Sequence, residues 1–232
     1  MQQAIQGKLS KQLPTDGDAR QLLREIEMER AKLIKQKKIK AAPPLPPITA
    51  DEIPFDIPQN WQWVRLGDLA YSIQYGYNAP AATSGKIKLL RISDIQNNFV
   101  DWAKVPFCEI DDENIEKYLL KNNDILFART GGTVGKSLLI ENLTESVIFA
   151  SYLIRANYNK NLDCHYLKFF MESPLYWLQL KEGTLGTAQP NCNGQKLLKM
   201  IFPLPPLAEQ KRIVANLEEL LPLCDRLAEK LK

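Results

Sequence analysis

The chain has 232 residues, of which 45% are hydrophobic and 25% are charged, and its formal net charge is +3 at pH 7. This composition is typical of a globular protein with a real core, and it excludes disordered and membrane-embedded chains. No run of 18 apolar residues occurs and the N-terminus lacks a secretory signal pattern, so we expect a cytoplasmic protein.

Histidine and cysteine usage restricts the chemistry. The single histidine, His165, opens an amphipathic run, which favours a structural or surface role over catalysis. The four cysteines contain no Cys-x-x-Cys pair, so the sequence predicts reduced thiols rather than a zinc site or a disulfide framework. We therefore expect neither a catalytic residue nor a metal site in this chain.

The basic excess lies at the N-terminus. Residues 1–50 carry ten Lys and Arg against five Asp and Glu, whereas residues 51–205 carry fifteen against seventeen. A nucleic-acid binder normally presents a basic face. The near-neutral middle segment therefore argues mildly against nucleic-acid binding unless its cations cluster in space.

The first predicted element is a helix over residues 18–38. Asp16 or Asp18 caps its first turn, and its apolar stripe includes Leu22, Ile26 and Leu33. Lysines fill its end, where cations suit the helix dipole; a phosphate-binding arm is the alternative interpretation of these lysines.

A proline-rich segment follows at residues 41–58. Its prolines forbid a helix and favour extended polyproline geometry, which predicts a semi-rigid linker and a domain boundary. Binding to a proline-recognition module is the alternative function.

Residues 61–204 consist of short apolar segments separated by Gly, Asn, Asp and Pro. The expected strands are 61–66, 87–92, 124–129, 137–140 and 147–155, and the expected helices are 166–171 and 175–180. The sequence thus predicts a strand-rich α+β domain whose function lies in its loops.

One of these loops, at residues 131–137, imitates a phosphate-binding motif. It ends in Gly-Lys-Ser after a predicted strand, but Thr130 stands where the motif needs a glycine, and a strand-like segment follows instead of a helix. Both departures argue against nucleotide hydrolysis.

The polar loops nevertheless carry side chains that suit nucleic acid. Arginine grips guanine at two points, and Asn or Gln grips adenine at two points, so Arg129, Gln189, Asn191 and Asn193 are equipped to contact base edges. Phosphate contacts are expected from Lys86, Thr130, Thr133 and Lys136. Turns favour the same residue types, so composition alone leaves both interpretations open.

Residues 206–232 form a long amphipathic run. Its apolar stripe includes Ile213, Leu217, Leu220 and Leu227 and requires a partner helix. Pro222 lies inside this run and predicts a kink or restart near Leu221.

Five segments with distinctive sequences occur in order along the chain. They are Trp61-x-Trp-Val-Arg-Leu-Gly-Asp-Leu, Gly76-Tyr, Asn123-Asp-Ile-Leu-Phe-Ala-Arg-Thr-Gly-Gly-Thr-Val-Gly-Lys, Gly186-Thr-Ala-Gln-Pro-Asn and Pro203-Leu-Pro-Pro-Leu-Ala-Glu-Gln-Lys-Arg-Ile. Together they resemble the specificity subunit of type I restriction-modification enzymes. Residues 4–9 and 22–39 are also similar to the helical region of that family.

The resemblance implies an α+β fold in which a strand-rich target recognition domain is flanked by an N-terminal helix and a long, coiled-coil-like spacer helix. The expected domains are an N-terminal helical region at 1–40, the linker at 41–58, the recognition domain at 59–205 and the start of the spacer at 206–232. Family subunits carry two recognition domains, so this chain is expected to be the first portion of a longer chain. A half-subunit that dimerises through its helices is the alternative.

The resemblance further implies a non-catalytic subunit that reads half of a split double-stranded DNA site and docks the modification (methyltransferase) and restriction subunits. S-adenosylmethionine, ATP and Mg are then expected in those partners and none of them in this chain. The candidate DNA-contacting residues are Tyr75, Tyr77, Asn78, Lys86, Arg91, Arg129, Thr130, Thr133, Lys136, Gln189, Asn191 and Asn193. A protein-interaction scaffold with little intrinsic DNA binding is the alternative function.

Overall fold

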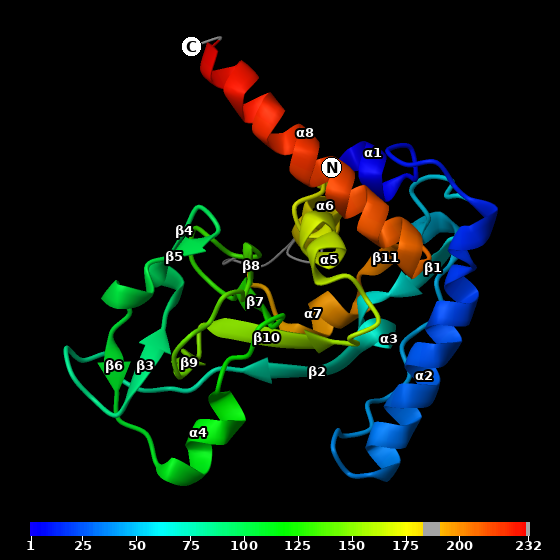
Figure 1. The fold of residues 1–232 in the computed structure, drawn as a ribbon. Coiled ribbons are helices and arrows are strands. Elements are labelled where there is room, and N and C mark those ends of the chain that lie inside the picture. The colour runs from blue at the N-terminus through cyan, green and yellow to red at the C-terminus, as the bar shows by residue number, and fades with distance from the viewer. Residues whose placement is uncertain (183–190, 231–232) are drawn as a thin grey trace. The chain divides into compact units, whose positions relative to one another are not determined.

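The computed structural model describes residues 1–182 and 191–230. The chain forms two compact units that alternate along the sequence (Figure 1). Unit 1 comprises Met1–Leu69, Asn159–Leu178 and Leu198–Lys232, and unit 2 comprises Ala70–Tyr158 and Gln179–Leu197. These limits do not coincide with the domain boundaries expected from the sequence, which stay predictions.

Unit 1 is mainly helical. Its helices are α1 (Gln2–Ile5), α2 (Ala19–Lys35), α3 (Leu66–Leu69), α5 (Cys164–Phe170), α8 (Leu207–Lys230) and the first half of α6 (Pro174–Glu182), with 3-10 turns η1 (Pro14–Asp16) and η2 (Ala50–Glu52). Strand β1 (Gln62–Arg65) pairs antiparallel with β11 (Ile201–Leu204), so the first and last of the five sequence segments lie side by side.

The helix predicted at residues 18–38 is confirmed as α2. Asp18 caps it by accepting a hydrogen bond from the backbone N–H of Arg20. Leu22 and Ile26 are buried, whereas Leu33 is half-buried and the lysines of the last turn are exposed. The apolar stripe therefore faces the core of unit 1 mainly through its first two turns.

The long C-terminal helix α8 is also confirmed, and it packs beside α5 (Figure 1). The restart predicted near Leu221 is wrong, because the helix continues through Pro222, and the alternative of a kink there stays a prediction. Proline removes one backbone N–H donor, and the remaining bonds on either side maintain the helix here. The stripe is buried at Ile213 and Leu217 but exposed at Leu220 and Leu227, with exposed fractions of 42% and 64% for the last two.

A buried carboxylate at the start of α8 joins distant parts of unit 1. Glu209 is fully buried, and its Oε1 accepts hydrogen bonds from the Ser10 hydroxyl and the Gln12 amide, both at 2.8 Å. Its Oε2 accepts the indole N–H of Trp61 at 2.8 Å. Three donors satisfy this buried charge, as burial requires.

Two neighbouring residues of α8 extend these connections. The Gln210 amide oxygen accepts the backbone N–H of Asp163, which opens α5, and its amide nitrogen donates to Pro205. The Arg212 guanidinium grips both carboxylate oxygens of Asp16 at 2.6 Å and holds the pKa of that carboxyl below its usual value.

The proline-rich segment is held within unit 1 by a buried arginine. Arg65, 5% exposed, donates to the carbonyl oxygens of Pro46 and Pro47 and pairs with both oxygens of Glu52 at 2.9 Å. Gly67 lies close beside it, and an added Cβ there would lie 3.0 Å from the Leu198 carbonyl oxygen and would force the Leu45 side chain to move. The segment thus packs on β1 within unit 1.

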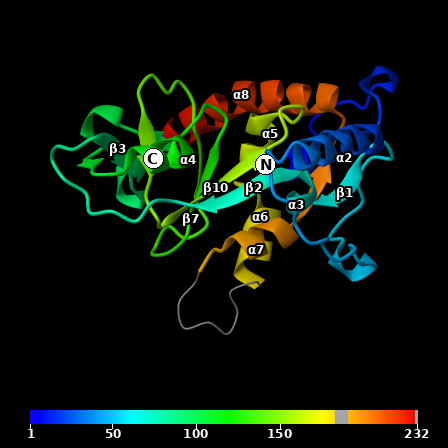
Figure 2. The ribbon, with the colours of Figure 1, turned by 90° about the horizontal axis from the view of Figure 1, so that it is seen from below.

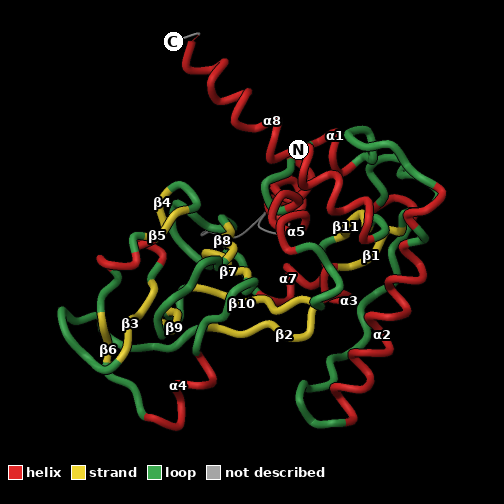
Figure 3. Tube along the Cα trace, in the orientation of Figure 1, coloured by secondary structure: helices red, strands yellow, loops and turns green. Residues whose placement is uncertain are grey.

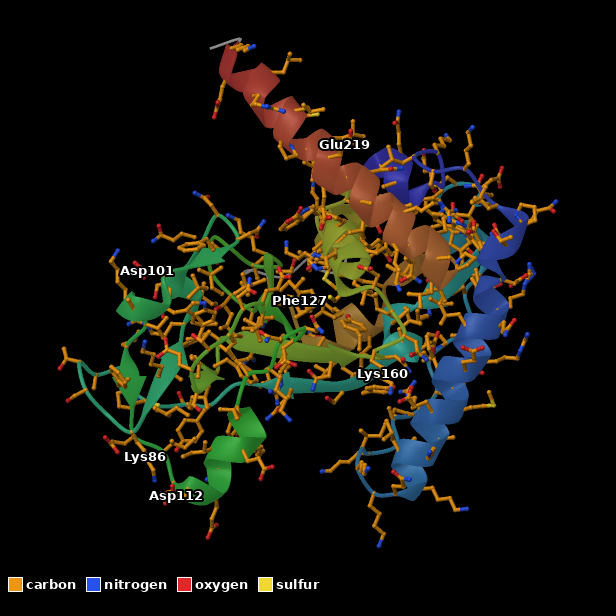
Figure 4. The ribbon with its side chains drawn as sticks, viewed as in Figure 1. Lys86, Asp101, Asp112, Phe127, Lys160 and Glu219 are labelled. Carbon is orange, nitrogen blue, oxygen red and sulfur yellow. The ribbon has the colours of Figure 1, made fainter. Side chains whose placement is uncertain are left out.

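Unit 2 contains most of the strands, which are joined by long loops (Figure 3). Its main sheet has the order β2-β10-β7-β8 and is antiparallel throughout, and a second sheet has the order β6-β3-β9. These elements are β2 (Ala70–Tyr75), β3 (Ile87–Leu90), β6 (Phe107–Cys108), β7 (Ile125–Ala128), β8 (Ser137–Leu139), β9 (Val147–Phe149) and β10 (Leu153–Tyr158). Phe127 of β7, labelled in Figure 4, is fully buried in the main sheet.

The smaller elements of unit 2 complete its surface. They are the hairpin β4 (Ile95–Gln96) and β5 (Phe99–Val100), the 3-10 turns η3 (Ile92–Asp94) and η4 (Trp102–Lys104), helix α4 (Asp112–Tyr118) and the first residues of α7 (Gly194–Lys199). Asn97 and Asn98 both have positive φ, as a two-residue turn between antiparallel strands requires.

Most of the strands expected from the sequence are present, with one correction. The single strand predicted at 147–155 is wrong, because residues 151–152 turn and separate β9 from β10, which join different sheets. An unbroken apolar run gives no sign of such a change of sheet. Strand β2 was not predicted because its side chains are mostly half-buried and of mixed polarity. No described helix is long and apolar enough to cross a membrane.

Replacing Glu209 with alanine is expected to lower the free energy of unfolding by roughly 3 kcal/mol, since it leaves the buried indole N–H of Trp61 without a partner. Urea unfolding followed by circular dichroism measures this change. Glu219→Ala is the matched control on the exposed face of the same helix, and it is expected to change stability by less than about 0.5 kcal/mol. Equal effects of both substitutions would contradict the structural role of Glu209.

The Arg65–Glu52 pair makes stability depend on acid pH. Its hydrogen bonds lower the pKa of Glu52 from 4.5 to about 2, so the carboxylate stabilises the folded state above pH 4.5 and this contribution is lost as the pH falls towards 2. We expect Glu52→Gln to be less stable than the wild type at pH 7, with a difference that shrinks over that interval. Urea midpoints measured from pH 7 to pH 2 check this; a difference that stays constant would refute it.

Candidate nucleic-acid interface

The loops of unit 2 meet at one end of the main sheet. In the antiparallel register, Tyr75 at the end of β2 pairs with Ile154, and Leu153 pairs with Ala128 at the end of β7. Figure 2 shows the three strands β2, β10 and β7 that carry these residues. Arg129, Lys136 and Tyr152 flank these strand ends. We call the group of Tyr75, Arg129, Lys136, Tyr152 and Asn191 the Tyr75 end of the sheet.

Tyr75 and Arg129 form a stacked pair there. The guanidinium carbon of Arg129 lies 4.9 Å from the centre of the Tyr75 ring, within the range of a cation–π contact. The Tyr75 hydroxyl accepts the backbone N–H of Gly194 at 3.2 Å. The main chain of Arg129 receives the N–H of Cys192 and donates its own N–H to Tyr152, so three loops are joined at this residue.

Two polar atoms at this end of the sheet are buried without a hydrogen-bond partner, namely Nε of Arg129 and Oδ1 of Asn191. Native structures contain few such atoms, and a missing ligand is one explanation for them. Lys136 is exposed and, in the part of the chain that the structure describes, forms no ion pair. Arg129 and the exposed Lys136 bring positive charge to this end of the sheet, which suits an anionic partner.

Other predicted residues of these loops serve the local structure. Asn193 caps α7, where its Oδ1 accepts the N–H of Lys196 at 2.9 Å. Thr133 accepts the N–H of Lys136 in the turn between β7 and β8, and Thr130 is half-buried beside it. Ser137 opens a strand, so the loop lacks the helix that a phosphate-binding motif requires.

Tyr77 and Asn78 follow β2 and run beside β9. The Tyr77 ring packs on Tyr118 with ring centres 5.2 Å apart, and the Asn78 side chain accepts the Ser151 hydroxyl at 3.4 Å. Gly76 is required before them, because an added Cβ would lie 2.2 Å from the Ala150 carbonyl oxygen. Tyr77 therefore contributes mainly to packing.

Lys86 and Arg91 already have carboxylate partners. Lys86 pairs with Asp112 at 2.7 Å, as labelled in Figure 4, and Arg91 pairs with Asp94 at 2.7 Å. Their charges are partly neutralised in the free protein. Gln189 was predicted to contact bases and lies outside the residues that the structure describes.

Sequence reasoning missed Tyr152, whose side chain is 61% exposed at the Tyr75 end. The strand predicted over residues 147–155 concealed the turn that exposes it. Reasoning from sequence also missed Arg155, which lies in the same sheet and donates to Asp124 and to the carbonyl oxygens of Leu119 and Lys117. No signal in one sequence separates this buried arginine from one that faces a ligand.

The described residues offer little support for catalysis at this site. Burial raises the pKa of the nearby Cys192 thiol to about 12, which keeps it protonated and unreactive at neutral pH. Over residues 1–182 and 191–230, no group of three or more His, Cys, Asp or Glu side chains is arranged to hold a metal ion.

Comparison with known proteins gives consistent results. Residues 58–232 match the family of the type I restriction modification DNA specificity domain. The specificity subunit of the EcoAI type I restriction enzyme from Escherichia coli is 31% identical over 98% of this chain and 39% of its own length. The EcoEI specificity subunit from the same species is 26% identical over 100% of this chain and 41% of its own.

Solved structures show the same fold. The HsdS subunit from Thermoanaerobacter tengcongensis aligns over 92% of this chain and 51% of its own with a TM-score of 0.58 at 19% identity. A chain from a structural study of complex assembly and conformational transition of the type I R-M system aligns over 90% of this chain with a TM-score of 0.60 at 20% identity. This chain thus spans about two fifths of the length of the first two sequence relatives.

These comparisons confirm the resemblance to type I specificity subunits and the expected α+β fold. Specificity subunits are the non-catalytic subunits of their complexes, in agreement with the prediction that this chain is not an enzyme. With its family match covering residues 58–232, the chain belongs to the type I restriction-modification specificity subunit family, with a single DNA specificity domain.

Proposed function

We propose that this chain reads one half of a bipartite double-stranded DNA target through the Tyr75 end of the sheet. The observation that carries the proposal is the Arg129 guanidinium, which lies over the Tyr75 ring and whose Nη groups form no hydrogen bond with any described residue. Arginine and asparagine are the side chains that recognise guanine and adenine edges in the major groove. The exposed Lys136 next to them supplies a phosphate contact.

The helices of unit 1 have a separate role in this proposal. The stripe on α8 is buried by unit 1 at Ile213 and Leu217, whereas Leu220, Leu223 and Leu227 are exposed. Exposed leucines at this spacing suit a second helix. We propose that α8 helps to set the distance to the other half-site and that the helical surface docks the modification and restriction subunits.

The chemistry of the complex then belongs to those partners. S-adenosylmethionine, ATP and Mg would bind the modification and restriction subunits, and this chain would supply the choice of DNA sequence. In this proposal, the chain and its partner subunits work in the cytoplasm. Support comes from the family match and from relatives that are named as specificity subunits.

A protein-interaction scaffold is the second candidate. It is favoured by the number of cations of unit 2 that already have acidic partners, including Lys86, Lys88, Arg91 and Lys104. Phosphate attraction dominates most DNA binding, and paired cations contribute less to it. The two candidates differ in how binding responds to salt.

Alanine substitutions at the Tyr75 end are expected to weaken DNA binding. Arg129→Ala should reduce affinity for a target-containing duplex by roughly 10-fold, because it removes a two-point contact with a base edge. Fluorescence anisotropy at fixed salt, with the full chain and its modification subunits, measures the change. Lys104→Ala is the control, since Lys104 is exposed in unit 2 and paired with Asp101. If both variants bind alike, the site is misplaced.

Salt titration of the same complex tests the phosphate contact. Binding should weaken steeply as salt rises, and Lys136→Ala should lower the slope of log K against log salt by about 0.9, the value for one phosphate on duplex DNA. Lys104→Ala should leave the slope unchanged. Association with partner subunits at every salt concentration, without salt-dependent DNA binding, would favour the scaffold.

A further inference from the structure

We infer that Tyr75 is a positioning residue that presents the outer edge of Arg129, with its Nη1 and Nη2 groups, to a guanine in the major groove. This inference rests on the proposed function, because it names the base and the side-chain geometry at that same site. Among the guanidinium nitrogens of Arg129, Nε is buried and has no hydrogen-bond partner. The two Nη groups form no hydrogen bond with any described residue.

The ring that supports Arg129 is itself fixed. Tyr75 ends β2 in register with Ile154, and its hydroxyl accepts the Gly194 N–H at 3.2 Å. Gly194 is packed so closely that an added Cβ would lie 2.5 Å from Ile73. The Tyr75 ring is therefore held at both ends, by the sheet and by the loop that leads into α7.

The main chain of Arg129 is fixed as well. Its N–H donates to the carbonyl of Tyr152 at 2.9 Å, and its carbonyl accepts the Cys192 N–H at 3.0 Å. With the backbone held by two loops and the guanidinium lying on an aromatic ring, the side chain loses little rotamer freedom when it binds. The pair is thus organised before DNA arrives.

The Nη1 and Nη2 groups of Arg129 match the hydrogen-bond acceptors of guanine better than those of adenine. Two N–H groups in one plane match the O6 and N7 acceptors that guanine presents in the major groove, whereas adenine presents one acceptor and one donor. A lysine ammonium is a point charge and cannot reproduce the planar fork. Arg155 shows the contrast, because its guanidinium donates to Asp124 and to carbonyl oxygens in the same sheet.

Selection from a pool of random-sequence duplexes tests this inference. The full chain with its modification subunits is incubated with the pool, and the bound duplexes are sequenced. We expect the wild type to enrich a guanine at one position of the half-site. Arg129→Lys should reduce that guanine preference by roughly 10-fold, and Tyr75→Leu should reduce it by about 2- to 5-fold through loss of the stacking contact.

Two further variants separate positioning from folding. Tyr75→Phe loses the hydroxyl that accepts the Gly194 N–H but retains the ring face and its place in β2, so we expect a guanine preference within about 2-fold of the wild type. Phe99→Leu removes an exposed aromatic ring elsewhere in unit 2 and should leave the preference unchanged. Loss of the preference in Tyr75→Phe as well as in Tyr75→Leu would overturn the role given to the ring.

The remaining outcomes distinguish this inference from the proposed function. A wild-type pool with no enriched sequence would contradict the proposed function itself. An enriched half-site whose guanines are unaffected by Arg129→Lys and Tyr75→Leu would leave that function standing and overturn the inference alone.

Discussion

The buried carboxylate of Glu209 is the interaction on which the helical unit depends. A charge that is fully removed from water must be matched by donors, and Glu209 obtains them from Ser10, Gln12 and Trp61. Ser10 and Gln12 belong to the N-terminal segment, and Trp61 comes directly before β1. One side chain of α8 therefore connects both of these segments to the C-terminal helix. The Pro203–Ile213 sequence segment therefore has a structural explanation that does not involve DNA.

The arginines of the chain differ in how many hydrogen bonds their side chains form within the protein. Arg65 and Arg155 are buried, and each donates several hydrogen bonds to carbonyl oxygens and a carboxylate. Among the described residues, Arg129 is held through its main chain and the face of Tyr75, and none of them forms a hydrogen bond with its Nη groups. This contrast locates the candidate interface more sharply than net charge does.

Much of the fold could be predicted because it follows from local patterns. The helices α2 and α8 follow the apolar periodicity of their sequences. The strands β3, β7 and β8 form where short apolar segments predict them, so the local pattern and the tertiary structure agree at these elements. The failures also have physical causes. The turn at residues 151–152 lies inside an apolar run, and α8 continues through Pro222 because one missing hydrogen bond does not end a long helix.

By itself, the sequence determined the family, the α+β class and the residue types at the candidate interface, since these depend on composition, periodicity and ordered motifs. Only the tertiary structure decided which of those residues meet. Tyr75 and Arg129 are 54 positions apart and come together because β2 and β7 flank β10 in an antiparallel sheet, whereas Lys86 and Arg91 fold onto carboxylates. Strand register and local ion pairing arise from contacts between distant segments, which one sequence does not record.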